Sequence, residues 1–176
     1  MKLDQGFIQV YTGNGKGKTT AAIGQAIRAM GAGLSVCFIQ FMKDYAYSEL
    51  EILQGFAPHL KLLRYGNDAF VFKKQPPEAA LVEEMRCGLR EAERAMISGE
   101  YDLVILDEVL VSVYFKLLDV DDIKKIVKKK PHQVELILTG RYCPQEINDL
   151  ADLVSEIKEI KHYYQRGISA RKGIES

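Results

Sequence analysis

The chain of 176 residues has no tryptophan, only three cysteines and no excess of either charge. Cys37, Cys87 and Cys143 are odd in number and lack C-x-x-C spacing, so neither a disulfide framework nor a zinc site is indicated, and a reducing cytoplasm is expected. Lys and Arg number 24, as do Asp and Glu, which gives no basic field for nucleic acid. No apolar run approaches the ~18 residues of a membrane span, and no signal peptide is recognisable. We therefore expect a cytoplasmic protein that binds neither nucleic acid nor a membrane.

Apolar segments and helical patterns alternate along the chain, and their order predicts the fold. Nearly continuous apolar runs, typical of buried parallel strands, cover 7–11, 34–41, 59–65, 101–107 and 134–138. Helices are expected at 21–30, 48–54, 77–98, 119–130 and 144–154, and a helix or turn at 109–118. Residues 155–162 fit either a helix or a final strand. This alternation predicts a single α/β domain, residues 1–176, with a doubly wound, mostly parallel sheet and with ligands at the C-terminal ends of its strands.

A glycine-rich loop between the first expected strand and the first expected helix is the strongest functional signal. The segment 12–20 reads T-G-N-G-K-G-K-T-T, a P-loop pattern whose first glycine comes one residue late. Glycines allow successive backbone N–H groups to point at one anion, and the following helix adds its positive N-terminal end. We therefore expect a nucleotide site and a P-loop NTPase (RecA-like) fold, against the alternative of a chance glycine-rich turn. The residues expected to bind the nucleotide are Gly13, Asn14, Gly15, Lys16, Gly17, Lys18, Thr19 and Thr20.

Four side chains have expected chemical roles in this site. Lys18 is expected to reach the phosphates, and the hydroxyl of Thr19 to bind Mg²⁺. Asp107 and Glu108 end a buried strand, where a carboxylate would hold the same Mg²⁺ directly or through water. The alternative is that the acidic pair caps the helix that follows. Spacing does not say which of the two is the metal ligand and which a neighbouring base, so Glu108 joins Lys18 and Thr19 as a catalytic candidate.

Two further sets of residues fit either a structural or a binding role. Arg141 follows the strand expected at 134–138, at the same edge as the acidic pair, so it either binds phosphate or lies on the surface. Phe70 and Phe72 lie in an otherwise polar loop, where they either pack on the core or line a pocket for a flat apolar ligand. Composition alone favours the core for both phenylalanines.

These residues resemble one family, the P-loop ATP:corrinoid adenosyltransferases, over nearly the whole chain. The most specific match is the loop T-G-N-G-K-G-K-T-T, including its shortened spacing. Further matching segments are Gln40-Phe41-Met42-Lys43, Leu106-Asp107-Glu108, Thr139-Gly140-Arg141, Lys161-His162, Gly167, Ala170 and Gly173-Ile174-Glu175.

The resemblance implies adenosyl transfer rather than hydrolysis. In this family the Co(I) of a corrinoid attacks the ribose 5′ carbon of ATP and expels triphosphate, with ATP bound in reverse of the usual P-loop sense. The resemblance implies ATP and a corrinoid such as cobalamin as substrates, and Mg²⁺ (or Mn²⁺) held by Thr19 and by Asp107 or Glu108. It also implies a C-terminal tail, about 161–176, over the site, a flavodoxin-like reductant and a homodimer.

The same resemblance changes the expectation for the two phenylalanines. Phe70 and Phe72 match the phenylalanine and tryptophan of a G-F-T-W run, which presses under the corrin and displaces the lower axial ligand of cobalt. A ligand contact is therefore favoured over the core, with a smaller wedge because the chain has no tryptophan. The chain also departs from the family at Gln165, which replaces an acidic residue, and at Leu50 and Glu51, which replace parts of an E-R-N run.

Two other functions fit the phosphate loop and the acidic pair. An ordinary P-loop ATPase or small-molecule kinase would release orthophosphate or ADP, whereas adenosyl transfer releases triphosphate. A non-catalytic module would bind ATP and corrinoid without turnover.

Overall fold

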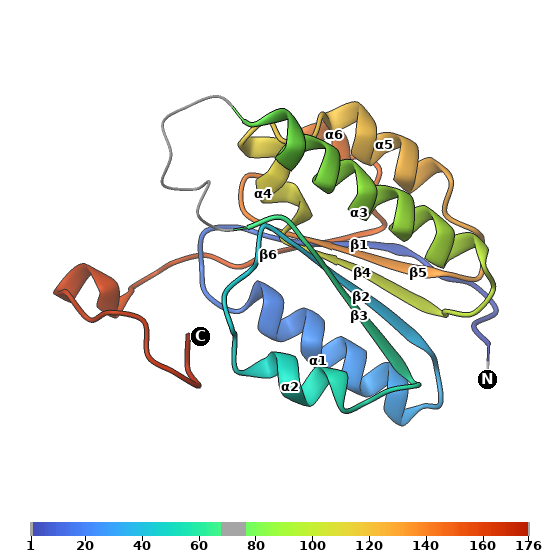
Figure 1. Ribbon diagram of the computed structural model, residues 1–176, viewed down its shortest axis with the longest axis horizontal. Helices are drawn as coiled ribbons and strands as arrows, with labels where there is room; N and C mark the ends of the chain where they lie inside the picture. Colours follow the sequence, from blue (N-terminus) through green and yellow to red (C-terminus); the bar gives the residue numbers. More distant parts are fainter. Residues whose placement is uncertain (1, 68–76, 176) are drawn as a thin grey trace.

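Nearly continuous apolar runs form the strands of one parallel sheet in the computed structural model, which describes residues 2–67 and 77–175 (Figure 1). Its strands are β1 (Ile8–Thr12), β2 (Val36–Phe41), β3 (Leu60–Tyr65), β4 (Leu103–Asp107), β5 (Glu135–Thr139) and β6 (Leu153–Glu156). Their order across the sheet is β3-β2-β4-β5-β1-β6, and every pairing is parallel. The five strands predicted from the sequence are present, with bounds that differ by at most two residues.

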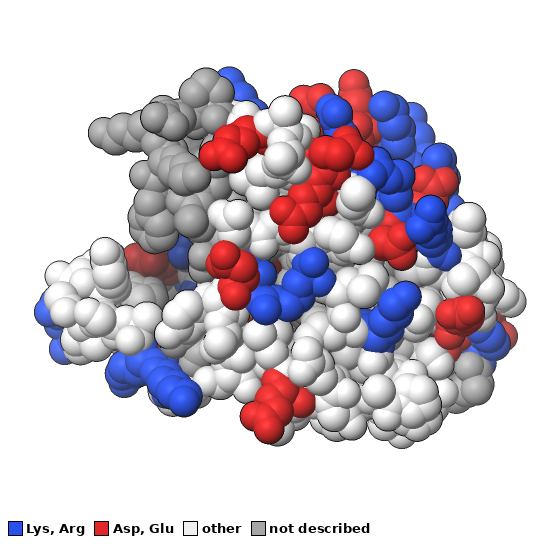
Figure 2. Space-filling model, viewed as in Figure 1, with Lys and Arg blue, Asp and Glu red and all other residues white. Residues whose placement is uncertain are grey.

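Helices cover both faces of this sheet, which confirms the doubly wound architecture. Figure 1 shows two helices on one face, α1 (Lys18–Gly31) and α2 (Glu49–Gln54). The other face carries α3 (Ala79–Ile97), α4 (Val109–Tyr114), α5 (Val120–Lys128) and α6 (Gln145–Asn148). Figure 2 shows acidic and basic side chains mixed over this second layer, in keeping with the balanced composition.

Two apolar clusters, one on each face of the sheet, hold these layers together. The alanines of α1 pack on one face with Leu53 of α2, and the buried stripe of α3 packs on the other with α4, α5 and α6. The helix predicted at 77–98 is present as α3, and its apolar side belongs to the core. Burial of this apolar area is the main stabilising term. Among the described residues, no helix is long and apolar enough to cross a membrane.

The helix predicted at 144–154 is wrong over most of its length. Helix α6 ends at Asn148, and Val154 belongs to β6. The helix ends early because the chain pairs with the free edge of β1 instead. The N–H of Asp152 donates to the carbonyl of Ile8 (2.8 Å), and the carboxylate of Asp152 accepts from the N–H of Ile8 (2.8 Å). The final strand left open at 155–162 is therefore real but begins earlier, and it adds an edge to the sheet.

After β6 the chain runs past the C-terminal ends of the strands and forms a short 3-10 turn, Tyr163–Arg166. Figure 1 shows this tail projecting from the sheet at the end where the β1–α1 loop lies. The strand ends, the β1–α1 loop and the tail thus meet at one end of the molecule.

Candidate active site

The glycine-rich loop between β1 and α1 requires its glycines. Gly13 and Gly17 have φ values of 96° and 122°, in the region that favours glycine. A Cβ atom on Gly13 would lie 2.4 Å from the carbonyl oxygen of Ile157. The N–H of Gly15 donates to that same oxygen (2.7 Å). The loop therefore packs directly on the chain that follows β6. Such close backbone contacts argue against the alternative of a chance glycine-rich turn.

Lys18 begins α1 and folds back across the loop. Its ammonium donates to the carbonyl of Gly15 (2.7 Å), and only 6% of the residue is exposed. Burial lowers the pKa of Lys18, while the nearby carboxylates of Glu108 and Asp107 act in the opposite direction. The first amides of α1 have no partner within the helix, so a buried cation and a helix N-terminus point at the same space.

Asp107, at the end of β4, is the buried centre of a hydrogen-bond network. Its Oδ1 accepts from the hydroxyl of Thr19 (2.9 Å) and from that of Thr139 (2.7 Å). Its Oδ2 accepts from the ammonium of Lys43 (2.8 Å) and, at 3.3 Å, from the amide of Gln40. The carboxylate is 0% exposed and accepts from four donors, which lie on β2, on β5, on α1 and in the loop that follows β2. In the sheet, β5 lies between β4 and β1, so Thr139 at the end of β5 lies between Asp107 and the β1–α1 loop.

Glu108 follows in the chain but has a different environment. Its backbone is left-handed (φ 61°), and its N–H donates to the hydroxyl of Thr139 (2.9 Å), so its side chain turns into the cavity beside the loop. Burial raises the pKa of Glu108, and the neighbouring Asp107 carboxylate raises it further. Glu108 precedes α4 without a side-chain capping bond. The alternative that the acidic pair caps this helix is therefore wrong.

A cavity of about 680 Å³ lies between the loop, the strand ends and the tail. The basic residues Lys16, Lys18, Lys43 and Arg141 line it, together with the carboxylates of Glu49, Glu108 and Glu175. Its remaining lining residues are Gly15, Gly17, Thr19, Thr20, Ile23, Tyr47, Ser48, His162, Gly173 and Ile174. Arg141 thus faces the cavity although the residue is exposed. Gly13, Asn14 and Asp107 are not among the lining residues: Gly13 shapes the loop, and Asp107 lies beneath the wall.

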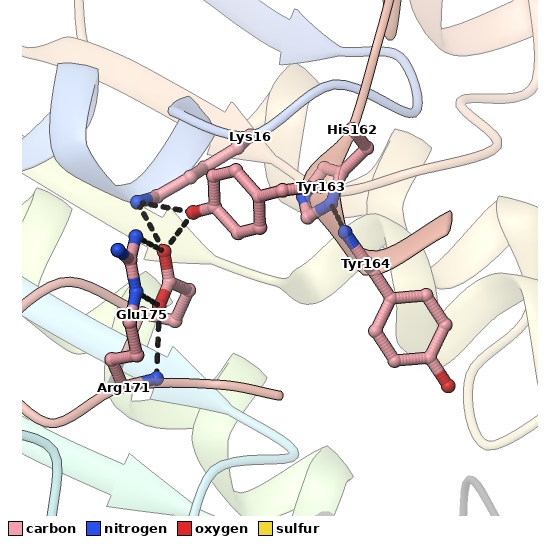
Figure 3. A network of polar contacts seen from close by, with 6 residues as sticks. All are labelled: Lys16, His162, Tyr163, Tyr164, Arg171 and Glu175. Atoms are coloured by element: carbon pink, nitrogen blue, oxygen red, sulfur yellow. Dashed lines mark hydrogen bonds and ion pairs between the residues drawn. The ribbon is translucent and has the colours of Figure 1, made fainter. Parts of the chain in front are cut away.

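The tail is tied to the loop through Glu175 (Figure 3). The Glu175 carboxylate accepts from the ammonium of Lys16 (3.1 Å) and from the hydroxyl of Tyr163. It also accepts from the backbone N–H (2.9 Å) and the guanidinium (3.2 and 3.1 Å) of Arg171, which lies over the Tyr163 ring. Favourable interactions with Arg171 and Lys16 outweigh the opposing effect of desolvation, so the pKa of Glu175 is lowered. An ion pair therefore joins the nucleotide loop to the chain end.

Sequence reasoning gave no role to three residues of this site. Gln40 on β2, Lys43 just after β2 and Thr139 on β5 all contact Asp107. A signal for them existed: all three stand at the C-terminal ends of parallel strands, where ligands gather in such sheets. The parallel register places Gln40 opposite Asp107, which the sequence of one strand could not reveal.

The side-chain oxygens of the site could hold a divalent metal only together with oxygen atoms of a bound ligand or of water. The described residues contain no group of three or more His, Cys, Asp or Glu side chains that could hold a metal by themselves. Mg²⁺ is, however, usually held by one or two carboxylates plus phosphate oxygens and water. Thr19, Asp107 and Glu108 supply such a set at the edge of the cavity. The buried Oε1 of Gln40 has no hydrogen-bond donor in the described structure, and a metal-bound water could supply one.

Phe70 and Phe72, for which the family resemblance implies contact with the corrin, lie outside the described residues.

The sheet order and the β1–α1 loop define the class of protein as a P-loop nucleotide-binding protein. A solved structure of the same architecture is the KaiC-like protein of Pyrococcus horikoshii OT3, with a TM-score of 0.55 over 86% of this chain and 73% of that chain. Its sequence identity of 16% carries the fold alone.

The sequence comparisons then give the family. Residues 4–176 match the sequence profile of the ATP:corrinoid adenosyltransferase family BtuR/CobO/CobP. The chain is 35% identical to the corrinoid adenosyltransferases of Escherichia coli (strain K12) and Salmonella typhimurium (strain LT2) over 173 residues, which is 98% of this chain and 86% of each relative. It is 30% identical to the corrinoid adenosyltransferase of a Sinorhizobium species over 98% of this chain and 81% of the relative. The chain belongs to the ATP:corrinoid adenosyltransferase family.

Proposed function

We propose that this protein transfers the 5′-deoxyadenosyl group of ATP to the Co(I) of a corrinoid such as cobalamin and releases triphosphate. The observation that carries the proposal is the cavity at the end of the sheet, in which the family's shortened phosphate loop meets the side chains of Lys16, Lys18, Lys43 and Arg141. Four cationic side chains around one cavity, beside carboxylates that a divalent metal could neutralise, suit a leaving group with several negative charges.

The reaction needs no nucleophile from the protein. Co(I) donates an electron pair to the 5′ carbon, the C5′–O bond breaks, and the bonding pair leaves with the triphosphate while cobalt becomes Co(III). The protein has to hold carbon and cobalt in line and to neutralise the charge that develops on the leaving oxygen. We assign the second task to the loop amides, Lys18 and Arg141, and the burial of Lys18 strengthens its interaction with an anion.

We infer that Mg²⁺ (or Mn²⁺) is held by Thr19 and the acidic pair. When bound, the metal supplies further charge neutralisation on the triphosphate. Glu108 faces the cavity and is proposed as the direct ligand. Asp107 already accepts from four donors, and it is proposed to orient Thr19 and metal-bound water.

The remaining assignments rest on the family. We propose that residues 1–176 form one domain whose tail, 161–176, covers the site; the Lys16–Glu175 ion pair supports this. Contact of Phe70 and Phe72 with the corrin stays a prediction, as do a flavodoxin-like reductant, a homodimer and a cytoplasmic location.

Anaerobic incubation with ATP, Mg²⁺ and chemically reduced cobalamin tests the proposal. The cobalt absorption spectrum and the phosphorus NMR spectrum of the products are followed together, with no-enzyme and no-ATP controls. We expect a light-sensitive adenosyl–cobalt product and an equal amount of triphosphate. ADP or orthophosphate without a cobalt–carbon bond would indicate a kinase or an ATPase instead. Binding of both substrates without products would indicate a non-catalytic module.

A further inference from the structure

Lys43, the second residue after β2, occupies an unusual place in the site. Its ammonium lies 2.8 Å from Oδ2 of Asp107 and 3.0 Å from the hydroxyl oxygen of Thr19, and the residue is only 9% exposed. The preceding residue, Met42, has a φ of 55°, which an ordinary side chain adopts only when its surroundings require it. The backbone is therefore held in an unfavourable conformation directly before this lysine.

The atoms that Lys43 contacts are the ones proposed above to hold or orient the divalent metal. Mg²⁺ takes oxygen ligands at about 2.0–2.1 Å and demands nearly octahedral geometry. An ammonium that donates to both Thr19 and Asp107 fills the space between them, and it carries the same sign of charge as the metal. Lys43 and the metal with its bound water are therefore alternatives at these oxygens.

A lysine displaced from Asp107 needs another anion, because an unpaired buried charge is strongly unfavourable. Lys43 lines the cavity together with Lys18 and the loop, where a polyphosphate would lie, and it is close enough to Lys18 to influence its pKa. Its flexible stem allows the ammonium to change partners without movement of β2.

We propose that Lys43 is a further phosphate-binding residue, which exchanges Asp107 for a triphosphate oxygen when the divalent metal takes up the Thr19 oxygen and its bound water takes up the Asp107 oxygen. This inference rests on the proposed function and deepens it, because it adds a residue to the binding of the leaving group. It predicts effects of opposite sign: Lys43 weakens binding of the metal alone and strengthens binding of triphosphate together with the metal.

Two binding measurements on Lys43→Met test this, neither of which depends on adenosyl transfer. Mn²⁺ binding is followed by the loss of the free-ion electron paramagnetic resonance signal, and binding of inorganic tripolyphosphate at saturating Mg²⁺ by calorimetry. Lys43→Gln is measured in parallel, because its amide can still donate to Asp107 and keep the variant folded. Lys129→Met is the matched control: it also removes a lysine from an ion pair with a carboxylate, that of Glu93 (2.6 Å), on the helical face formed by α3 and α5.

We expect both Lys43 variants to bind Mn²⁺ alone more tightly than the wild type and to bind tripolyphosphate about tenfold more weakly, as for loss of one charge-assisted hydrogen bond. The control should change neither affinity. Tripolyphosphate affinity within twofold of the wild type in both variants, or a lower Mn²⁺ affinity, would overturn the proposal. A wild-type protein that does not bind tripolyphosphate would instead remove the phosphate site itself, and with it the proposed function.

Discussion

Two carboxylates organise the two ends of the site, and they are built differently. Asp107 is 0% exposed. Its carboxylate accepts hydrogen bonds from residues on β2, β5 and α1 and from Lys43. Glu175 belongs to the chain end and receives its bonds from Lys16, Tyr163 and Arg171 at the surface (Figure 3). One network is part of the core, and the other joins an exposed tail to the loop.

The difference teaches which part of the site is fixed and which can move. Breaking a buried charge network leaves uncompensated groups in the core, whereas a surface ion pair can be replaced by water at little cost. The region proposed to bind metal and phosphate is therefore preorganised, and we expect the tail contact to be the one that opens for substrates and products. The following predictions break or sharpen this contrast.

Removing the buried carboxylate should have the largest effect. Asp107→Ala leaves Lys43 without its counter-ion, so we expect the free energy of unfolding in urea to fall by about 3–5 kcal/mol and activity to be lost. Asp121→Ala, which breaks the exposed pair with Lys124, is the control and should leave both nearly unchanged. Equal stability of the Asp107 variant and the wild type would mean that the network does not hold the core.

The two lysines of the loop should differ in the same sense. Lys18→Ala removes a buried donor from the phosphate region, and we expect the rate constant to fall about 10²–10³-fold, as for loss of one preorganised donor. Lys16→Ala removes an exposed partner of Glu175 and should cost much less. Steady-state rates at saturating ATP compare the two, and a larger effect at Lys16 would contradict the comparison.

Loosening the tail should change access to the site more than the chemistry. Glu175→Gln removes the charge that holds Lys16 and Arg171, so limited proteolysis should cut the tail faster while the thermal midpoint hardly moves. Glu156→Gln, which breaks an exposed ion pair with Lys158 before the tail begins, serves as the matched control. Unchanged tail cleavage in Glu175→Gln would show that the ion pair does not hold the tail.

The smallest expected effect is one of pH, and it has opposite signs for two glutamates. The pKa of Glu108 is raised by burial and by Asp107, and that of Glu175 is lowered by Arg171 and Lys16 against the effect of desolvation. Carboxyl NMR titration should find Glu108 above, and Glu175 below, the ordinary glutamate pKa of about 4.3.

These shifts also set the sign of two stability changes. A raised folded pKa contributes stability that is lost as pH rises through it, so Glu108→Gln should be more stable than the wild type at neutral pH, and the gap should close as pH falls. The contribution of Glu175 should be present at neutral pH and be lost only as pH falls through its lowered pKa. Equal pKa values for Glu108 and Glu175 would contradict the contrast between the two carboxylates.

The sequence predicted the buried parts of the molecule well and the surface parts poorly, for physical reasons. Apolar runs and the glycine loop specify the strands and the positions of Lys18, Thr19 and Asp107, because burial and phosphate geometry leave few alternatives, although α1 begins at Lys18 and not at the expected residue 21. It did not reveal Lys43, because its role depends on β2 lying beside β4.

The strand β6 and the contact between the tail and the loop could not be predicted from the sequence for a similar reason. Strand β6 is exposed along its length, so it carries no apolar pattern, and only the free edge of β1 makes it a strand. The contact of Glu175 with Lys16 joins residues 159 positions apart, which no local pattern encodes.

The central claim is that the charged end of the sheet holds triphosphate as the leaving group. ATP carrying ¹⁸O in the oxygen between C5′ and the α-phosphorus tests it most directly, with reduced cobalamin under anaerobic conditions and mass spectrometry of both products. Attack at the 5′ carbon predicts that all the ¹⁸O is found in triphosphate and none in the adenosyl corrinoid. Retention of ¹⁸O on the nucleoside, with cleavage between phosphorus and oxygen, would contradict the account.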